Sequence, residues 1–340
     1  MNALQRVLPL HATARIRRWL GLAALALLPL LTAPVARADA VRLIFAGDVM
    51  LDDGPGRLIA AGGDPLHPFA LVLAEADYRI ANLECSVSTL GAPIPDKIYT
   101  FRAAPATLRV LDGRFDALAL ANNHSGDYGP EAFLDTLQRL EGAGFAAFGG
   151  GRNLHEAHRP LWIDRKGLRI AVLAYNEYKP RAFEAGPRHP GVAWSEDEDV
   201  VADIRAARAA GADLVIPFMH WGWEQEPEPG LRQRSLARRM IDAGADLVVG
   251  GHPHVTQGAE YYKGRLIVYS LGNFVFDGFD DQPAARRGWL LRLTLDKGGL
   301  LHWDTLEARM DDDGTPWPVS GVLTPCGRAG DKVVGLCRNP

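Results

Sequence analysis

The sequence predicts an α/β fold in which a mainly parallel β-sheet is covered on both faces by helices. Short apolar runs rich in Val, Ile and Leu, which are typical of buried strands, alternate along the chain with longer amphipathic stretches, which are typical of helices. Alternating strands and helices are the pattern of a parallel sheet with helices on both sides. The 340 residues are 47% apolar and 23% charged, which is the composition of an ordinary globular protein.

Seven apolar runs are expected to form the buried strands, because each is short, rich in branched side chains and bounded by polar or glycine-rich segments. These runs are residues 41–46, 78–83, 117–121, 168–175, 214–219, 247–249 and 266–271.

Four amphipathic stretches between these runs are expected to form helices. They are residues 105–111, 130–143, 196–210 and 231–243. Proline stands at the start of the first two, where its missing N–H costs nothing. Glycine follows the last two, as Gly211 and Gly244, and is typical of the end of a helix. Later, residues 289–295 and 300–306 alternate apolar and polar side chains, which predicts an antiparallel hairpin and therefore either a mixed sheet or a second sheet packed on the first.

The N-terminal segment, residues 1–38, is expected to be a secretory signal peptide. Its first part carries four arginines and no acidic residue, an apolar run follows, and Ala36-Arg37-Ala38 forms an A-x-A cleavage pattern. A retained membrane anchor is the alternative, but two prolines interrupt the apolar run that would have to span about 20 residues. The sequence therefore predicts a periplasmic or secreted protein with no stable membrane span after processing. An arginine pair in the basic part leaves both the Sec and the twin-arginine routes open.

A single domain is expected over residues 39–310, followed by a tail over residues 311–340. Cys326 and Cys337 in the tail could form a disulfide in an oxidising compartment. Removal of residues 1–38, which contain five arginines and no acidic residue, changes the formal net charge from −4 to −9. Such a charge does not favour nucleic acid as a partner.

Polar side chains follow six of the predicted strands, where each strand ends. They are Asp48, Asn82 and Glu84, the segment from Asn122 to Asp127, His220, His252 and His254, and Asn273. Because ligands bind beyond the carboxyl ends of the strands in α/β sheets, we expect these side chains to share one rim. Carboxylate and amide oxygens together with imidazole nitrogens suit Zn²⁺, Mn²⁺ or Fe, so one or two divalent ions are expected.

Each of these residues also has an interpretation without a metal. Asp48 could be a turn residue at the end of a strand. His220 could be a hydrogen-bonded core histidine. Cys85 adjoins Glu84 but lacks a thiolate partner, so it is not expected to be a ligand.

Six motifs in order resemble the CapA family of bacterial capsule and poly-γ-glutamate synthesis proteins. The motifs are Gly47-Asp48, Asn82-Leu83-Glu84, Asn122-Asn123-His124, His220-Trp221-Gly222, the run from Gly251 to Val255 and the run from Tyr269 to Phe274. The resemblance covers residues 41–277. It implies a branch of the calcineurin-like metallophosphatase fold, a four-layer α/β/β/α sandwich of two mixed sheets flanked by helices.

The resemblance also implies roles for the matching positions. Asp48 and His254 would bind a first metal, Glu84 would bridge, Asn123, His220 and His252 would serve a second metal, and His124 would be the general acid. The sequence departs from the superfamily's usual Asp-x-His at the first strand, since Val49 and Met50 follow Asp48. One histidine ligand is therefore missing, and Glu84 stands in place of an aspartate.

Four further residues are expected to bind substrate: Asn82, Lys97, Arg102 and Asn273. Lys97 and Arg102 could bind a carboxylate or a phosphate, for which Arg offers a planar fork, although a solvated basic loop is the alternative.

The function expected from these features is that of an exported metal-dependent hydrolase of phosphoesterase type. It would act on an anionic polymer or a phosphoester in capsule, poly-γ-glutamate or cell-envelope polymer metabolism. The alternative is a non-catalytic metal- or polymer-binding partner of a capsule synthesis or export complex. A nucleotidase is less favoured, because no second domain for base recognition is visible.

Overall fold

The computed structural model describes residues 40–179, 181, 183–319 and 324–328. The predicted signal peptide and Cys337 of the predicted disulfide lie outside these ranges. Among the described residues, no helix has both the length and the apolar character needed to cross a membrane.

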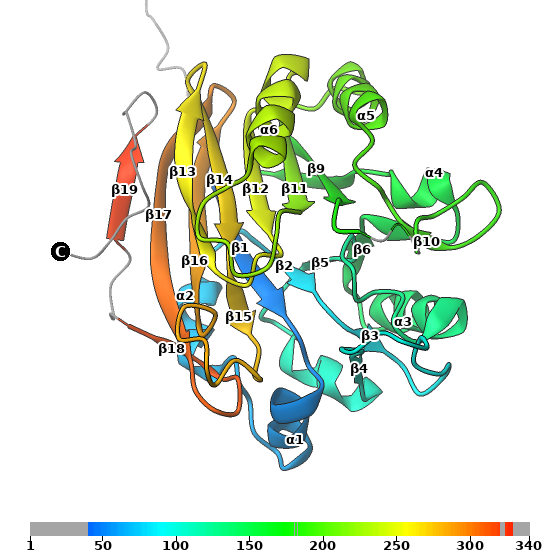
Figure 1. Ribbon diagram of the computed structural model, residues 1–340. Coiled ribbons are helices and arrows are strands. Elements are labelled where there is room, and N and C mark those ends of the chain that lie inside the picture. The colour runs from blue at the N-terminus through cyan, green and yellow to red at the C-terminus, as the bar shows by residue number, and fades with distance from the viewer. Residues whose placement is uncertain (1–39, 180, 182, 320–323, 329–340) are drawn as a thin grey trace, which may run out of the picture. The chain divides into compact units, whose positions relative to one another are not determined.

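Two β-sheets form the centre of the domain (Figure 1). The nine-stranded sheet contains β1 (Val41–Val49), β2 (Tyr78–Leu83), β5 (Ala117–Ala119), β6 (Ala146–Phe148), β15 (Asn273–Val275), β16 (Arg287–Asp296), β17 (Gly299–Met310), β18 (Pro316–Pro318) and β19 (Thr324–Arg328). Its order is β18-β17-β16-β1-β2-β5-β6, with β15 paired to β1 and β19 paired to β17. It is mixed, because β1 pairs in parallel with β2 and antiparallel with β16.

The six-stranded sheet contains β8 (Leu161–Arg165), β9 (Leu168–Asn176), β11 (Leu214–His220), β12 (Leu247–Gly251), β13 (Thr256–Tyr262) and β14 (Arg265–Leu271), in the order β13-β14-β12-β11-β9-β8. Two small ladders join β3 (Ser86–Val87) to β4 (Arg102–Ala103) and β7 (Gly150–Gly151) to β10 (Gly191–Val192).

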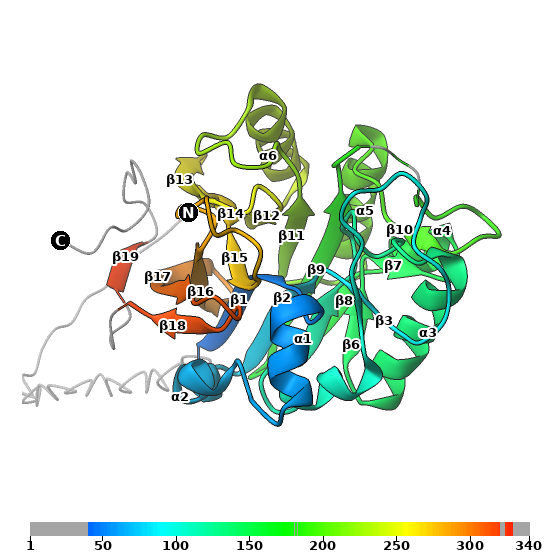
Figure 2. The same cartoon turned by 60° about the horizontal axis from the view of Figure 1, so that its bottom comes forward.

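Helices cover the outer face of each sheet (Figure 2). Packed on the nine-stranded sheet are α1 (Asp53–Ala60), the 3₁₀ helix η1 (His67–Phe69), α2 (Ala70–Ala74), the 3₁₀ helix η2 (Pro105–Val110) and α3 (Gly129–Gly142). Packed on the six-stranded sheet are α5 (Asp197–Ala209) and α6 (Leu231–Ala243), while α4 (Leu154–Ala157) lies beside β7. The predicted four-layer sandwich is confirmed.

Side-chain alternation along the strands creates three apolar cores. In β1, Leu43 and Phe45 point into the core between the sheets, where they meet Ile170 and Ile216 of the other sheet. Ile44 points to the opposite side, into the core beneath the helices. Successive side chains of a strand face opposite ways, so a strand that is buried on both faces must be apolar throughout. This is why these strands read as continuous apolar runs in the sequence.

The predicted elements are present with small differences at their ends. Residues 105–111, expected as a helix, form a 3₁₀ helix. The predicted late hairpin is the antiparallel pair β16 and β17, and both of its possible consequences occur, since the sheet is mixed and a second sheet packs on it. Beyond residue 310, β18 and β19 pair with β17 and so continue the nine-stranded sheet.

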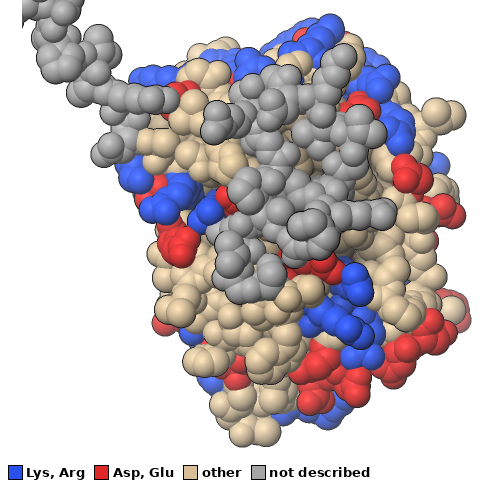
Figure 3. All heavy atoms as spheres, turned by 90° about the vertical axis from the view of Figure 1, so that its left-hand side faces the viewer, with Lys and Arg blue, Asp and Glu red and all other residues tan. Residues whose placement is uncertain are grey.

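Acidic and basic side chains on the nine-stranded sheet are arranged in pairs. Arg287 contacts Glu307 at 3.0 Å, and Arg292 contacts Asp304 at 3.0 Å. Groups of both signs also lie next to one another on the visible part of the face in Figure 3. Local pairing of this kind leaves little field to attract a polyanion by charge alone.

The close approach of β1 and β15 gives the first testable prediction. A Cβ atom on Gly47 would lie 1.9 Å from the carbonyl oxygen of Gly272. We expect Gly47→Ala to lower the free energy of unfolding by at least about 1–3 kcal/mol, because the strands next to Asp48 would have to separate. Gly258→Ala in β13 is the control, since a Cβ there meets nothing within 4 Å. Equal midpoints for the two variants in urea denaturation would contradict this packing.

Candidate metal centre

Two buried carboxylates from neighbouring strands lie at the centre of the site. Asp48 is in β1, and Glu84 directly follows β2. Both are fully buried. The side-chain amide of Asn82 donates to Asp48 Oδ1 at 2.8 Å and to Glu84 Oε2 at 3.1 Å, which fixes both groups. Burial raises the pKa of Asp48, and burial together with the nearby Asp48 charge raises the pKa of Glu84 well above its ordinary value.

Three histidines from the six-stranded sheet face these carboxylates. His220 ends β11, and His252 and His254 follow β12. His220 Nε2 lies 3.7 Å from Glu84 Oε1 and 3.1 Å from His252 Nδ1. His254 lies 3.6 Å from Asp48 Oδ2 through Nδ1 and 3.8 Å from Glu84 Oε1 through Nε2. Burial lowers the pKa of His220 and His252 well below the ordinary value, so both are neutral and able to act as ligands at neutral pH.

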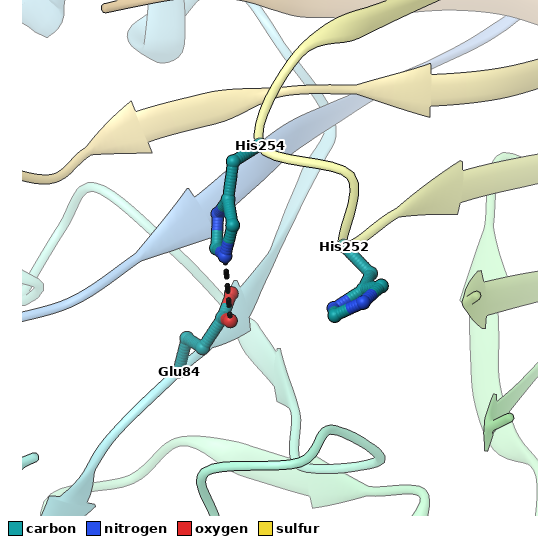
Figure 4. A group of neighbouring side chains, drawn as sticks. All are labelled: Glu84, His252 and His254. Atoms are coloured by element: carbon teal, nitrogen blue, oxygen red, sulfur yellow. Dashed lines mark ion pairs between the residues drawn. The ribbon is translucent and has the colours of Figure 1, made fainter. Parts of the chain in front are cut away.

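The backbone at two of these histidines is held in an unfavourable conformation. His252 has φ of 94° and His254 has φ of 57°, in the left-handed region that non-glycine residues rarely adopt. Such positions cost about 1–3 kcal/mol each and cluster at functional sites. Both imidazoles have a ring nitrogen within 4.8 Å of a Glu84 oxygen, and Figure 4 shows the His254 imidazole directed at Glu84.

Three buried polar atoms of this cluster lack a hydrogen-bond partner among the described residues: Asp48 Oδ2, Glu84 Oε1 and His252 Nε2. Unsatisfied buried acceptors are costly, and their gathering in one place calls for a shared cation. Two overlapping groups of donors have their ligand atoms within 4.8 Å of one another, one formed by Glu84, His252 and His254 and the other by Asp48, Glu84 and His220. The donor set therefore fits a divalent metal ion, and Glu84 belongs to both groups.

A second, smaller cluster next to the donors contains His124. Its Nδ1 lies 2.6 Å from Asp127 Oδ2, and Asp127 is fully buried and also paired with Lys97. Lys97 Nζ donates to the backbone carbonyl of Asn123 at 2.6 Å. The Asn123 side-chain oxygen lies 2.7 Å from His220 Nε2, so the two clusters are contiguous. Burial lowers the pKa of His124, although Asp127 acts in the opposite direction.

The dependence of metal affinity on pH follows from these shifts. A metal must displace the protons that Asp48 and Glu84 retain above the usual carboxyl range, so affinity falls as pH falls. Because the pKa values of Asp48 and Glu84 are raised in the folded protein, the folded state binds their protons more tightly than the unfolded state does. The metal-free protein therefore becomes less stable as pH rises and these protons are lost. We therefore expect the gain in Tm on adding Mn²⁺ to be larger at about pH 8 than at about pH 5. Thermal unfolding of chelated and metal-loaded protein measures this, and a gain that is larger in acid would contradict it.

A comparison with known families now identifies the chain's relatives. The family model described as "Bacterial capsule synthesis protein PGA_cap" matches residues 42–278, which include all the donor residues. The chain belongs to this family.

Two CapA proteins from bacilli are similar to the chain over most of its length. The PGA biosynthesis protein CapA of Bacillus subtilis (strain 168) is 33% identical over 290 residues, covering 83% of this chain and 74% of that protein. The capsule biosynthesis protein CapA of Bacillus anthracis is 33% identical over 310 residues, covering 86% and 73%. Among solved structures, the 5′-nucleotidase precursor from Thermus thermophilus matches with a TM-score of 0.50 and 16% identity, covering 82% of this chain and 56% of that one. This last likeness concerns the fold alone.

The structure brings most of the predicted site residues of this PGA_cap domain together. Asp48, Glu84, Asn123, His124, His220, His252 and His254 form the two contiguous clusters, and Lys97 joins them. Arg102 has different contacts: its guanidinium donates to the backbone carbonyls of Leu90 and Gly91 and stacks on Tyr128.

Two asparagines predicted to bind substrate have positioning contacts instead. Asn82 holds the two carboxylates, and Asn273 Oδ1 lies 2.8 Å from His254 Nδ1. Both side chains are buried.

The position at which the sequence lacks a histidine, two residues after Asp48, is part of the apolar core. Met50 occupies that position, and its side chain is buried in the core beneath the helices. Burial raises the pKa of the Cys85 thiol to about 12.

Three residues of the site were given no role from the sequence, although Asn122 and Asp127 belong to the segment that was expected at the rim. Asp127 holds His124, and Asn122 donates to Asn82 Oδ1 at 2.9 Å. The Tyr178 ring packs on His252 with 4.0 Å between centroids. The spacing of Asp127, three residues after His124, is the signal that could have identified the first of them. Tyr178 follows a different strand and carried no comparable signal.

Proposed function

We propose that this protein is an exported, metal-dependent hydrolase of phosphoesterase type that acts in capsule, poly-γ-glutamate or cell-envelope polymer metabolism. One observation carries the proposal. A buried set of carboxylates and imidazoles with three unpartnered atoms lies next to a histidine that a buried aspartate holds in place. Membership of the PGA_cap family supports the cellular context.

The donor residues divide into two adjoining sets. By the contacts of the two histidines His254 and His220, Asp48, Glu84 and His254 would hold one divalent ion, and Glu84, Asn123, His220 and His252 would hold a second. Bound ions of this kind supply Lewis acidity toward a phosphoryl or carbonyl oxygen and activate water. The mixture of oxygen and imidazole ligands favours Mn²⁺, Zn²⁺ or Fe.

His124 is the proposed general acid. Because Asp127 accepts a hydrogen bond from Nδ1, the proton that His124 donates to a leaving oxygen must come from Nε2. The Phe101 amide donates to the same aspartate oxygen at 2.9 Å, and the Phe101 ring packs against the imidazole at 4.6 Å between centroids. These contacts restrict the ring to one orientation, which is what proton transfer to a fixed substrate requires.

Lys97 is the proposed contact for an anionic group of the substrate. Its side chain is 28% exposed, and its ammonium contacts Asp127 and the Asn123 carbonyl at the edge of a cavity of about 300 Å³ that Asn122 and Asn123 also line. Arg102 would act only on parts of the substrate that extend beyond this cluster.

The proposal is tested with the purified mature chain from residue 39 onward. Its metal content is measured by elemental analysis, and turnover is measured with Mn²⁺, Zn²⁺ or Fe²⁺ on bis-p-nitrophenyl phosphate, p-nitrophenyl phosphate and a γ-glutamyl polymer. We expect bound metal and hydrolysis of at least one phosphoester. A protein that binds no metal and turns over none of the substrates would overturn the proposal.

The second candidate is a non-catalytic metal- or polymer-binding partner of a capsule synthesis or export complex. The observation that favours it is Met50, which provides no imidazole where the superfamily usually has one. Metal binding without turnover on any substrate would favour this role.

Export rests on the features of residues 1–38. The mature N-terminus of protein recovered from the periplasm or the medium tests it.

A further inference from the structure

A cavity of about 570 Å³ adjoins the metal centre and has no part in the proposed chemistry. Three loops line it, and they follow β9, β10 and β11. Tyr178, Trp194 and Trp223 supply one aromatic side chain from each loop. Tyr178 also packs on His252, one of the donor residues. The Tyr178 ring therefore lies between this cavity and the metal centre. A cavity of this size is within the usual range for binding small molecules.

Two of the aromatic rings form a corner. Tyr178 and Trp223 are 6.2 Å apart between centroids with 80° between their planes. Trp223 is 68% exposed, which is unusual for so large an apolar side chain at the lip of a cavity. The Arg181 guanidinium lies over the third ring, that of Trp194, at 4.9 Å. Tyr178 and Trp223 therefore do not form a pair of parallel faces that would enclose a planar base on both sides.

Four of the five charged groups that line the cavity are paired with one another, and Lys179 is the fifth. Glu177 accepts from Arg232 at 2.7 Å and from the Ser195 hydroxyl at 2.7 Å. Arg181 donates to Glu196 at 2.8 Å. A carboxylate paired with a guanidinium does not attract an anionic chain by charge. The two groups still offer hydrogen-bond acceptors and donors side by side in fixed positions.

From this combination we infer that the cavity binds a neutral saccharide that forms the non-reacting part of the substrate. The C–H face of a pyranose ring packs on an aromatic ring, and the hydroxyls around its edge both donate and accept hydrogen bonds. Trp223 offers the exposed ring, while the Glu177–Arg232 and Arg181–Glu196 pairs offer both partners for hydroxyls.

The cavity lies on the side of Tyr178 opposite to the metal centre's His252, which suggests how a bound saccharide would be joined to the reacting group. A sugar seated on Trp223 would extend past Tyr178 toward His252, where the phosphoryl group would lie. This part of the inference rests on the proposed function and makes the substrate a glycosyl phosphoester. Saccharide binding itself requires neither the metal nor His124.

The test measures binding without turnover. Isothermal titration calorimetry on the chelated mature chain uses maltotriose, cellotriose, triacetylchitotriose and, as a planar competitor, AMP. We expect at least one trisaccharide to bind, and Trp223→Ala to weaken that binding at least about tenfold. The matched control is Trp317→Ala, because Trp317 in β18 is also an exposed tryptophan, at 54%. This control should bind as the unaltered chain does.

Each outcome decides between the possibilities. Absence of binding at millimolar concentrations, equal binding by Trp223→Ala, or binding of AMP in place of the sugars would overturn the inference. With Mn²⁺ present, Trp223→Ala should also lower kcat/KM for a glycosyl phosphodiester relative to bis-p-nitrophenyl phosphate, and an unchanged ratio would remove the link to the reaction. Saccharide binding by a chain that hydrolyses nothing would overturn the proposed function and leave saccharide binding standing.

Discussion

Replacing His124 with alanine should lower the rate of phosphoester hydrolysis by about 10²–10⁴-fold, the usual contribution of a general acid. Metal content should stay unchanged, because the proposed metal ligands form the neighbouring cluster and His124 is not one of them. The rate is measured with bis-p-nitrophenyl phosphate, and the metal by elemental analysis of the same preparation.

The chain offers a matched control for this variant. His158 is mostly buried and its Nδ1 lies 2.7 Å from Asp203 Oδ2, so it reproduces the His–Asp contact outside the site. His158→Ala should retain full activity per folded molecule. If His124→Ala lost its metal together with its activity, His124 would be a ligand and the assignment as general acid would be wrong.

Replacing Glu84 with glutamine should have opposite effects on the metal-free and the metal-loaded protein. Without metal, the Glu84 carboxylate is buried beside Asp48, with Oε1 unpartnered. An uncharged amide can donate to Asp48 and avoids two buried negative charges side by side, so at pH values where Glu84 would otherwise ionise the metal-free variant should be more stable by about 1–3 kcal/mol. With metal, the variant should lose most of its bound ion and therefore the gain in Tm that the ion provides.

Denaturation with and without Mn²⁺ measures both effects of Glu84→Gln. Glu307→Gln is the control, since Glu307 pairs with Arg287 at the surface and should change neither quantity appreciably. Two results together would show that the Glu84 carboxylate has a purely structural role. The Glu84→Gln variant would be less stable than the unaltered chain without Mn²⁺, and it would still bind Mn²⁺ when the ion is added.

The sequence contains most of the information on the donor residues because of how each strand ends. Apart from Arg42, β1 is apolar up to Asp48, and β12 is apolar throughout, so Asp48 and His252 stand out as the first polar groups that end a buried run. Parallel strands then bring those positions to one rim, and no knowledge of side-chain packing is needed to expect this.

Contacts between loops could not be predicted in the same way. The bond between Asp127 and Lys97 joins two loops whose conformations depend on the finished fold. Arg102 has the right charge for a substrate contact, but its guanidinium is occupied by loop carbonyls, which no spacing pattern reveals. The edge strands β8 and β13 were missed because one side of each is only partly buried, which weakens the apolar pattern.

The donor residues are divided between the two sheets, with Asp48 and Glu84 on one and His220 and His252 on the other. Each of the two donor groups combines carboxylates of one sheet with histidines of the other, so both groups are complete only once the sandwich closes. The compartment in which folding finishes therefore selects the ion. A chain that crosses the membrane unfolded would load whatever the extracytoplasmic space supplies, whereas a chain that crosses already folded would carry a cytosolic ion out with it.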